Sequence, residues 1–305
     1  MPRALFTSKN LIGDGLYIQP ALKAWQQLHP DWDIDLLTNN DHITCLYEGM
    51  GIDRMRIIFE REDVRCSLPG EYDFEHEFQI NKAFELGEKK NYHISQAYFE
   101  LLDLPVPEYP VKVEYTPPEG ETEKDLILLS MFSNSCSSRD GKAPNKMISF
   151  AVWLPIITLA RQLGKVGVLG SEKDWGQAPL PIRDDEYYAG RSLADVARLM
   201  RDAKLLITID NGLGHLAATQ GTPTILFYPK CLRRHWIVPS GNPKLYVYQM
   251  DPLDLTVTIG TLVVREGIKS LLQGDQHEEK ATEEPPFEDK GQVSKEESDS
   301  NSSAA

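Results

Sequence analysis

The stretch Ile209-Asp210-Asn211-Gly212-Leu213-Gly214-His215-Leu216-Ala217-Ala218 decides the fold of this 305-residue chain. The apolar run Leu205–Ile209 predicts a buried strand that ends at an acid, and the glycines after it predict a turn that opens a helix. Such a turn presents backbone N–H groups and the positive end of the helix dipole to an anion, above all a phosphate or diphosphate. A structural role fits the pattern equally well. In that role Asp210 would cap the helix, and His215 would be a hydrogen-bonded residue of its first turn.

Strands and helices alternate on both sides of this stretch, which is typical of βαβ units built on a parallel sheet. Pro155 is expected in the first turn of its helix, where a missing N–H costs little. The expected strands are 126–129, 166–169, 205–209 and 224–227, and the expected helices are 153–163, 193–200, 216–219 and an amphipathic helix at 262–272. This half of the chain is therefore predicted to be a doubly wound α/β domain.

The first half of the chain shows the same alternation. Ala4–Thr7 predicts a strand, Gly13-Asp14-Gly15 a turn, and the spacing of Ile18, Leu22 and Trp25 a helix. Strands at 34–37 and 57–59 and a helix at 95–102 follow, and the proline-rich acidic segment 116–121 is the expected linker. We expect an N-terminal domain over 1–118, a C-terminal domain over 124–252, a packing helix within 253–274 and a tail over 275–305.

The tail is expected to be disordered, because it has almost no large apolar residues and many Glu, Ser and Lys. Its ten acids and three lysines give it half of the chain's formal charge of -14. A solvated extension and an interaction tail are both compatible with this composition. The remaining residues are also acidic overall, so the charge shows no footprint for duplex nucleic acid.

Composition excludes further classes of protein. No apolar run approaches the roughly 18 residues of a membrane-spanning helix, and no secretory signal precedes the first strand, so we expect a cytoplasmic protein. The four cysteines lack a CxxC pair, which favours reduced thiols. Asp31 and Asp33 have the spacing of metal ligands, but they are expected at the end of the sheet away from the ligand edge. We therefore expect no metal site.

Three other segments have side chains suited to chemistry. Asp14 lies between two glycines at a strand-to-helix junction, where an Asp is usually a turn or cap residue, yet a partly desolvated one at a domain interface could act as a base. The loop 135–146 and the segment 233–235 combine hydroxyl groups or cations that suit phosphate oxygens. Ordinary surface loops have the same composition. No Walker loop, GxSxG elbow or GxGxxG after the first strand occurs.

In their order, four segments resemble glycosyltransferase family 9, the bacterial heptosyltransferase-like enzymes with the two-domain GT-B fold. Together they span roughly residues 4 to 272. The segments are Ser8–Asp14 (SKNLIGD) with Pro20–Ala24 and Pro30-Asp31, Lys146 with Trp153, Gly170–Asp174 (GSEKD), and Ser192-Leu193 leading to Asp210–Ala218 (DNGLGHLAA) and Gly221–Thr224 (GTPT). The resemblance implies an α/β protein in which two Rossmann-like doubly wound domains face each other across a cleft.

The resemblance also implies roles for individual residues. Asp14 matches the general base that takes the proton from the acceptor hydroxyl, and Lys146 would neutralise charge on the leaving diphosphate. The donor-binding residues implied are Ser137, Ser138, Glu172, Asp210, Asn211, Gly212, Leu213, Gly214 and His215. Asp174 competes with Glu172 for the donor ribose. The chain departs from the family at Asn211, where Thr or Ser is usual, and in its acidic tail.

We therefore expect an inverting, metal-independent glycosyltransferase without a cofactor, whose partners are a nucleotide-diphosphate sugar and an acceptor hydroxyl. The family favours an acceptor like the lipopolysaccharide core, while a modified nucleic-acid base, a protein or a small saccharide stays open. Two alternatives remain. One is a nucleotide-sugar epimerase of the same architecture, and the other is a non-catalytic protein that binds sugar nucleotides.

Overall fold

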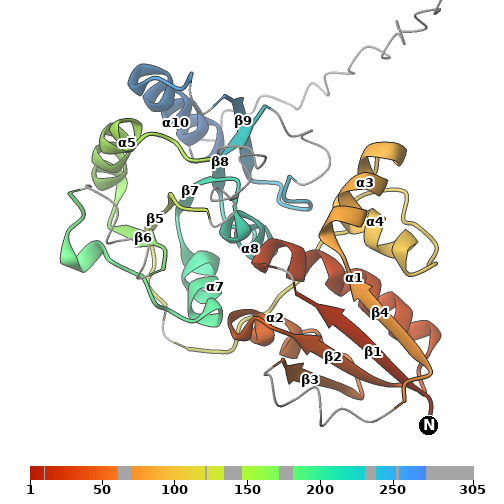
Figure 1. The fold of residues 1–305 in the computed structure, drawn as a ribbon. Coiled ribbons are helices and arrows are strands. Elements are labelled where there is room, and N and C mark those ends of the chain that lie inside the picture. The colour runs from red at the N-terminus through yellow and green to blue at the C-terminus, as the bar shows by residue number, and fades with distance from the viewer. Residues whose placement is uncertain are drawn as a thin grey trace, which may run out of the picture. The chain divides into compact units, whose positions relative to one another are not determined.

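The computed structural model describes residues 1–9, 11–60, 71–120, 122–133, 146–171, 181–230, 238–251 and 254–272. The chain divides into a compact unit of residues 1–274 and the segment 275–305, which lies outside the described residues, as does the prediction of a disordered tail. The compact unit is built on two parallel β-sheets, one from each half of the chain (Figure 1). The two-sheet α/β prediction is confirmed.

The first sheet has the strand order β3-β2-β1-β4. Its strands are β1 (Arg3–Ser8), β2 (Asp33–Thr38), β3 (Met55–Phe59) and β4 (Phe74–Phe78). Its helices are α1 (Ile12–Leu28), α2 (Thr44–Glu48), α3 (Ile80–Lys90) and α4 (Ile94–Leu101), with a 3-10 turn at Asp41–Ile43. All pairings are parallel, and β1 lies between β2 and β4. The strand order therefore reverses next to β1, which places a switch point at its carboxyl end.

The second sheet has the order β6-β5-β7-β8-β9, again with parallel pairings. Its strands are β5 (Ile127–Ser130), β6 (Val166–Leu169), β7 (Leu205–Ile209), β8 (Thr224–Pro229) and β9 (Leu245–Met250). Its helices are α5 (Phe150–Leu163), α7 (Leu193–Asp202), α8 (Gly212–Gln220) and α10 (Val257–Leu272), with a 3-10 turn at Asp184–Glu186. This order places the switch point of a doubly wound sheet between β5 and β7.

Alternate residues of the second sheet enter two different cores. Ile127 and Leu129 pack on the side of α5 and α10, whereas Leu126 and Leu128 face the other side with residues of α7 and α8. The core on the side of α7 and α8 also includes residues of the first sheet and of α1. The sheet is therefore covered on both faces, which explains its unbroken apolar strands.

Helix starts differ from the sequence expectation in three places. Both expected glycine turns are first turns of helices, because α1 already begins at Ile12 and α8 at Gly212. Pro155 was expected in the first turn of its helix but lies in the second turn of α5, which begins at Phe150. Ser149 extends that helix by accepting a hydrogen bond from the backbone N–H of Ala151 at 3.3 Å.

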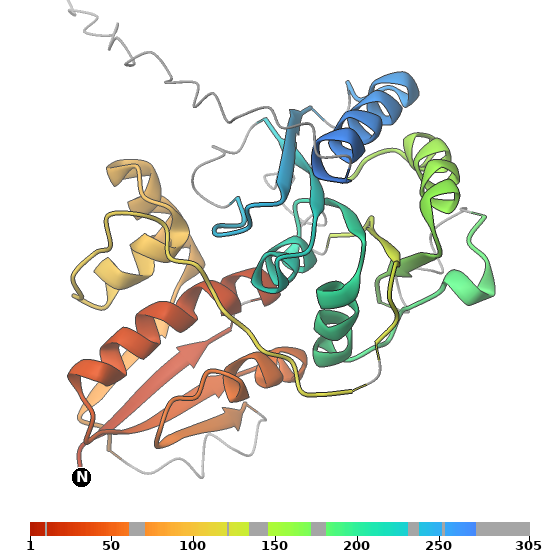
Figure 2. The same ribbon diagram turned by 180° about the vertical axis from the view of Figure 1, so that it is seen from behind.

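Residues 102–126 connect α4 to β5 and contact both halves of the compact unit (Figure 2). The N–H of Val111 donates to Ser95 Oγ at 3.1 Å, and Gln220 Nε2 donates to the carbonyl oxygen of Tyr115 at 2.7 Å. The expected linker 116–121 falls within this connection. The domain boundaries at 118, 124 and 252 stay predictions. Among the helices of the described residues, none is both long and apolar enough to span a membrane.

Candidate functional site

The first turns of α1 and α8 meet at the carboxyl ends of the two sheets. A Cβ atom on Gly212 would lie 2.7 Å from Ile12 Cβ, and one on Gly13 would lie 2.7 Å from His215 Cδ2. Contacts this short leave no room for a side chain, so the glycines allow the two helices to approach. Two positive helix ends thereby converge, which favours negative charge between them.

Asp14 is the third residue of α1 and is partly buried. Its carboxylate lies at the N-terminal end of α1, where it forms a hydrogen bond with the backbone of Leu11. Burial raises its pKa to about 6, while a hydrogen bond with the Leu11 backbone lowers the pKa. The charge of Lys146 lowers this pKa further, and that of Asp210 raises it. Asp14 therefore has the helix-capping role that its type suggests, and it is also a carboxylate that titrates near neutral pH.

Asp210 follows β7 and is buried, with its side chain 3% exposed. Its Oδ2 lies 2.7 Å from Lys146 Nζ, and its Oδ1 lies 3.9 Å from His215 Nε2. The lysine side chain is 14% exposed, so the ion pair is largely shielded from water. The structure thus brings Asp14, Lys146, Asp210 and His215 to one place.

His215 projects from the first turn of α8, and its side chain is 10% exposed. Burial lowers its pKa to about 4, the charge of Asp210 raises this pKa, and that of Lys146 lowers it. The imidazole is therefore neutral at pH 7. Its Nδ1 lies 2.8 Å from the hydroxyl oxygen of Tyr17 on α1, which makes a direct polar contact between the two halves.

Asn211, rather than Asp210, caps α8. Its Oδ1 accepts from the backbone N–H groups of Leu213 at 3.0 Å and Gly214 at 3.1 Å. Its Nδ2 donates to Ser130 Oγ at 2.8 Å and to the carbonyl oxygen of Phe132 at 2.9 Å, both after or at the end of β5. The amide therefore joins the two strands of the switch point, and in this structure it uses two N–H groups of the predicted anion site.

The remaining donor contacts that the resemblance implies are Ser137, Ser138 and Glu172. Ser137, Ser138 and Glu172 lie outside the described residues, as do Asp174 and the segment 233–235. Tyr17 and His93 belong to the site although the sequence did not point to them. Their rings meet edge to face with centroids 5.0 Å apart. An aromatic residue at helical spacing predicts core packing, so no local signal could have identified Tyr17.

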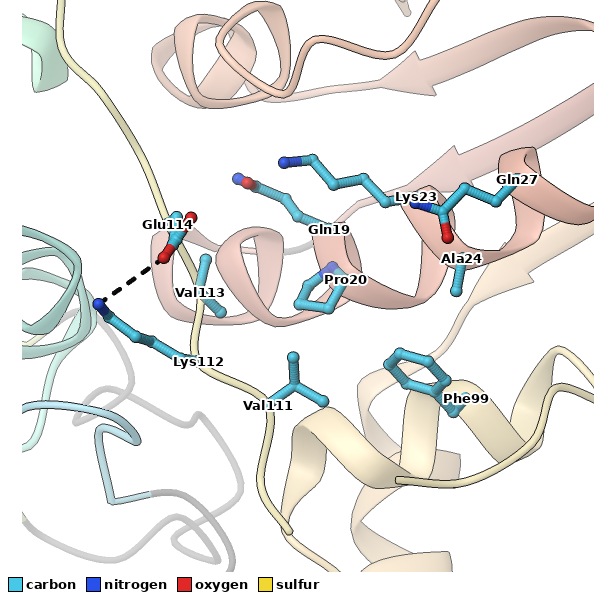
Figure 3. A pocket seen from close by; sticks show the side chains of 10 residues that line it. All are labelled: Gln19, Pro20, Lys23, Ala24, Gln27, Phe99, Val111, Lys112, Val113 and Glu114. Carbon is cyan, nitrogen blue, oxygen red and sulfur yellow. Dashed lines mark ion pairs between the residues drawn. The ribbon is translucent and has the colours of Figure 1, made fainter. Parts of the chain in front are cut away.

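A separate pocket of about 250 Å³ lies between α1, α4 and the connection 102–126 (Figure 3). Residues of α1, Phe99 of α4 and the connection 111–114 line it. Lys23, one of its α1 residues, follows Asp14 by two and a half helical turns and so lies on the opposite face of the helix. This pocket is distinct from the Asp14 site. In the part of the chain that the structure describes, His, Cys, Asp and Glu side chains form no group of three that could hold a metal ion.

Comparison with known proteins supports the resemblance. The family model described as glycosyltransferase family 9 (heptosyltransferase) matches residues 188–239, which include Asp210–His215. The family 9 glycosyltransferase of Veillonella parvula superposes with a TM-score of 0.66 at 15% identity, covering 89% of this chain and 97% of its own. A comparison with curated proteins found no match.

Two further solved structures have the same fold. ADP-heptose lipopolysaccharide heptosyltransferase II of E. coli has a TM-score of 0.63 at 15% identity and covers 88% of this chain and 99% of its own. E. coli heptosyltransferase WaaC, solved with ADP, has a TM-score of 0.57 at 17% identity, covering 87% of this chain and 99% of its own. The GT-B fold and the resemblance to family 9 are confirmed.

Proposed function

We propose that this chain, a glycosyltransferase of the family 9 type, transfers a sugar from a nucleotide-diphosphate donor to an acceptor hydroxyl with inversion and without a metal. The observation that carries the proposal is the convergence of Asp14, Lys146 and Asp210 where the N-termini of α1 and α8 meet. This arrangement combines a base with a cationic site for a leaving diphosphate.

In the proposed reaction the carboxylate of Asp14 takes the proton of the acceptor hydroxyl. The hydroxyl oxygen forms a bond to the anomeric carbon on the face opposite the diphosphate, and the bond from that carbon to the diphosphate oxygen breaks with both electrons. Lys146 and the positive end of α8 stabilise the charge on the leaving group. Such a positioned base contributes roughly 10²–10⁴-fold to a rate.

We infer the donor class from the nucleotides named for similar structures. The E. coli relatives are described with ADP-heptose or ADP, so an ADP-activated heptose is the first donor to test. The proposed acceptor is a saccharide of the lipopolysaccharide-core kind, because the family description names heptosyltransferases. Ser137, Ser138 and Glu172 are proposed to contact this donor, with Asp210–His215 beside its diphosphate.

The decisive experiment measures nucleotide release from ADP-heptose with and without a truncated lipopolysaccharide core acceptor. Acceptor-dependent release of ADP supports transfer, whereas conversion of the donor alone supports the epimerase alternative. Donor binding without turnover, under any acceptor tested, supports the binding protein. A thermal-shift screen of other nucleotide sugars covers a different donor, since a ligand at about 100 times its Kd stabilises a fold by roughly 2.7 kcal/mol.

Asp14→Asn is the matched variant for the base. We expect it to lose turnover by at least about 10²-fold while its donor Kd stays unchanged. It should fold at pH 8 at least as well as the wild type, because a buried carboxylate no longer has to be ionised. Full turnover by this variant would exclude Asp14 as the base.

A further inference from the structure

We propose that Tyr17 is a positioning residue, whose hydroxyl fixes the ring of His215 as the Nε2–H tautomer and thereby sets α1, with Asp14, against the Lys146–Asp210 pair. This inference rests on the proposed function for its kinetic consequences. Its structural part depends only on the contacts of Tyr17.

The direction of the Tyr17–His215 hydrogen bond follows from the group that the other ring nitrogen of His215 faces. Tyr17 is 3% exposed, and burial raises its pKa well above the usual value, so the hydroxyl keeps its proton. His215 Nε2 faces Asp210 Oδ1 at 3.9 Å, so the proton of the neutral ring lies on Nε2 and leaves Nδ1 as a hydrogen-bond acceptor. The hydroxyl hydrogen therefore points to His215 Nδ1, 2.8 Å away.

This bond stabilises the tautomer. The Tyr17 hydroxyl donates to the lone pair of Nδ1, while the single proton of the neutral imidazole stays on Nε2. Nε2 faces Asp210 Oδ1 at 3.9 Å, while Oδ2 pairs with Lys146 Nζ at 2.7 Å. Each oxygen of the buried carboxylate thus has its own neighbour. The opposite tautomer would place a lone pair against a carboxylate oxygen, which is repulsive.

The same bond holds the two halves in register. Tyr17 follows Asp14 by three residues, so both project from one face of α1. The ring of Tyr17 lies between His93, 5.0 Å away, and His215, 5.1 Å away, both in edge-to-face contact. His93 Nε2 is in turn 3.1 Å from the carbonyl oxygen of Val238. A shift of Tyr17 would therefore move Asp14 relative to Lys146.

The first experiment observes the tautomer directly. Nitrogen-15 NMR of histidine-labelled full-length protein at pH 7 should show His215 with an unprotonated Nδ1 and a protonated Nε2. The spectrum of His215→Gln identifies its signals among those of the seven histidines. A protonated Nδ1 in the wild type would overturn the proposal, and this measurement needs neither a substrate nor an altered Tyr17.

The second experiment compares Tyr17→Phe with Tyr98→Phe. Tyr98 is also fully buried in the first half, but its hydroxyl has no hydrogen-bond partner among the described residues, so its removal breaks no bond. We expect Tyr17→Phe to lower kcat by about 10–100-fold, as a misplaced base does, with donor KM nearly unchanged. Tyr98→Phe should keep kcat within about threefold. Equal kcat values for the two variants would contradict the positioning role.

The pH profile provides a readout that lost packing alone would not change. His215 faces Asp210 and Lys146 from the second half and Tyr17 and the Gly13 backbone from α1. In Tyr17→Phe the neutral His215 ring loses the hydroxyl that donates to its Nδ1. The pKa of His215 should therefore rise, and the ring should take up a proton at higher pH. The acid limb of kcat/KM should then steepen from one proton toward two. An unchanged NMR spectrum and slope in this variant would refute the inference, whereas a wild type that turns over no donor would refute only the proposed function.

Discussion

The ionisation of Asp14 is controlled at the scale of single residues. Burial raises its pKa to about 6, and the Lys146 charge limits that rise. A general base must be deprotonated, so activity is lost as the pH falls through this pKa. Because folding raises this pKa above the ordinary 3.8, the ionised Asp14 carboxylate lowers the stability of the fold, and this loss is complete above about pH 6. Such a loss is typical of functional carboxylates.

We predict that kcat/KM of the wild type declines below about pH 6 with a slope of one proton. In Lys146→Met the attraction that lowers the Asp14 pKa is absent, so the midpoint of this decline should move to higher pH. Lys146→Arg keeps the charge and serves as the control. Steady-state rates between pH 4.5 and 9, each scaled to the variant's own plateau, measure the shift. A midpoint that moves to lower pH in Lys146→Met would contradict this electrostatic account.

The site residues were predictable only in part. Asp14 and Asp210 could be predicted from their places after apolar strands, because parallel strands deliver their carboxyl ends to one edge. The partner of Asp210 could not be predicted without the family resemblance, since Lys146 follows a long polar loop. Tyr17 could not be predicted at all, because its chemistry depends on a histidine 198 residues later in the chain.

At the scale of elements, the approach of α1 and α8 depends on glycine. We predict that Gly212→Ala destabilises the fold or separates the helices, because its Cβ would lie 2.7 Å from Ile12 Cβ and 3.2 Å from the Gly13 nitrogen. Overpacking of this kind costs typically about 1–3 kcal/mol.

Gly214→Ala is the matched control on the same helix. Its Cβ would lie 3.5 Å from Thr208 Cγ2, an ordinary contact, and alanine favours a helix over glycine by up to about 1 kcal/mol. Urea denaturation should therefore rank Gly214→Ala at or above the wild type and Gly212→Ala below it. The reverse order would show that the two helices are not held this closely.

The strands divide into those that sequence predicts and those that it does not. The central strands β5, β7 and β8 are buried at every position, so their apolar pattern is strong. In β1, buried residues alternate with partly buried ones around the apolar run Ala4–Phe6. The edge strands β4 and β9 were not predicted from the sequence, whereas β3 and β6, at the opposite edges of the two sheets, were predicted. In β4, the exposed Glu75 and Glu77 alternate with Phe74, His76 and Phe78, so the strand has no continuous apolar run.

At the scale of the whole molecule, one hydrophobic cluster includes the first sheet, α1 and one face of the second sheet. Leu16 and Trp25 of α1 belong to the same cluster as Leu206 and Leu216 of the second half. The two halves that the sequence predicts as domains therefore share a core. Shared burial couples their unfolding.

We predict that the folded part of the chain unfolds in a single calorimetric transition whose van't Hoff and calorimetric enthalpies agree. A fragment of residues 1–118 should bind a hydrophobic dye, because it would expose the surface of α1 that α8 covers. Two separated transitions, or a fragment that is compact and silent to the dye, would show instead that the predicted domains fold independently.

The double attachment of Asn211 has a consequence for the ageing of the protein. An asparagine before a glycine is the pair that cyclises and deamidates most readily in an unstructured chain, and Asn211 precedes Gly212. Here the carboxamide is held at both ends, by Ser130 and Phe132 on one side and by two N–H groups of α8 on the other. Hydrolysis to aspartate would set a new carboxylate oxygen against the carbonyl oxygen of Phe132, beside a carboxylate that is already buried. The intact fold therefore protects its own amide, and storage damage at this position should report the fraction of time that the chain spends unfolded.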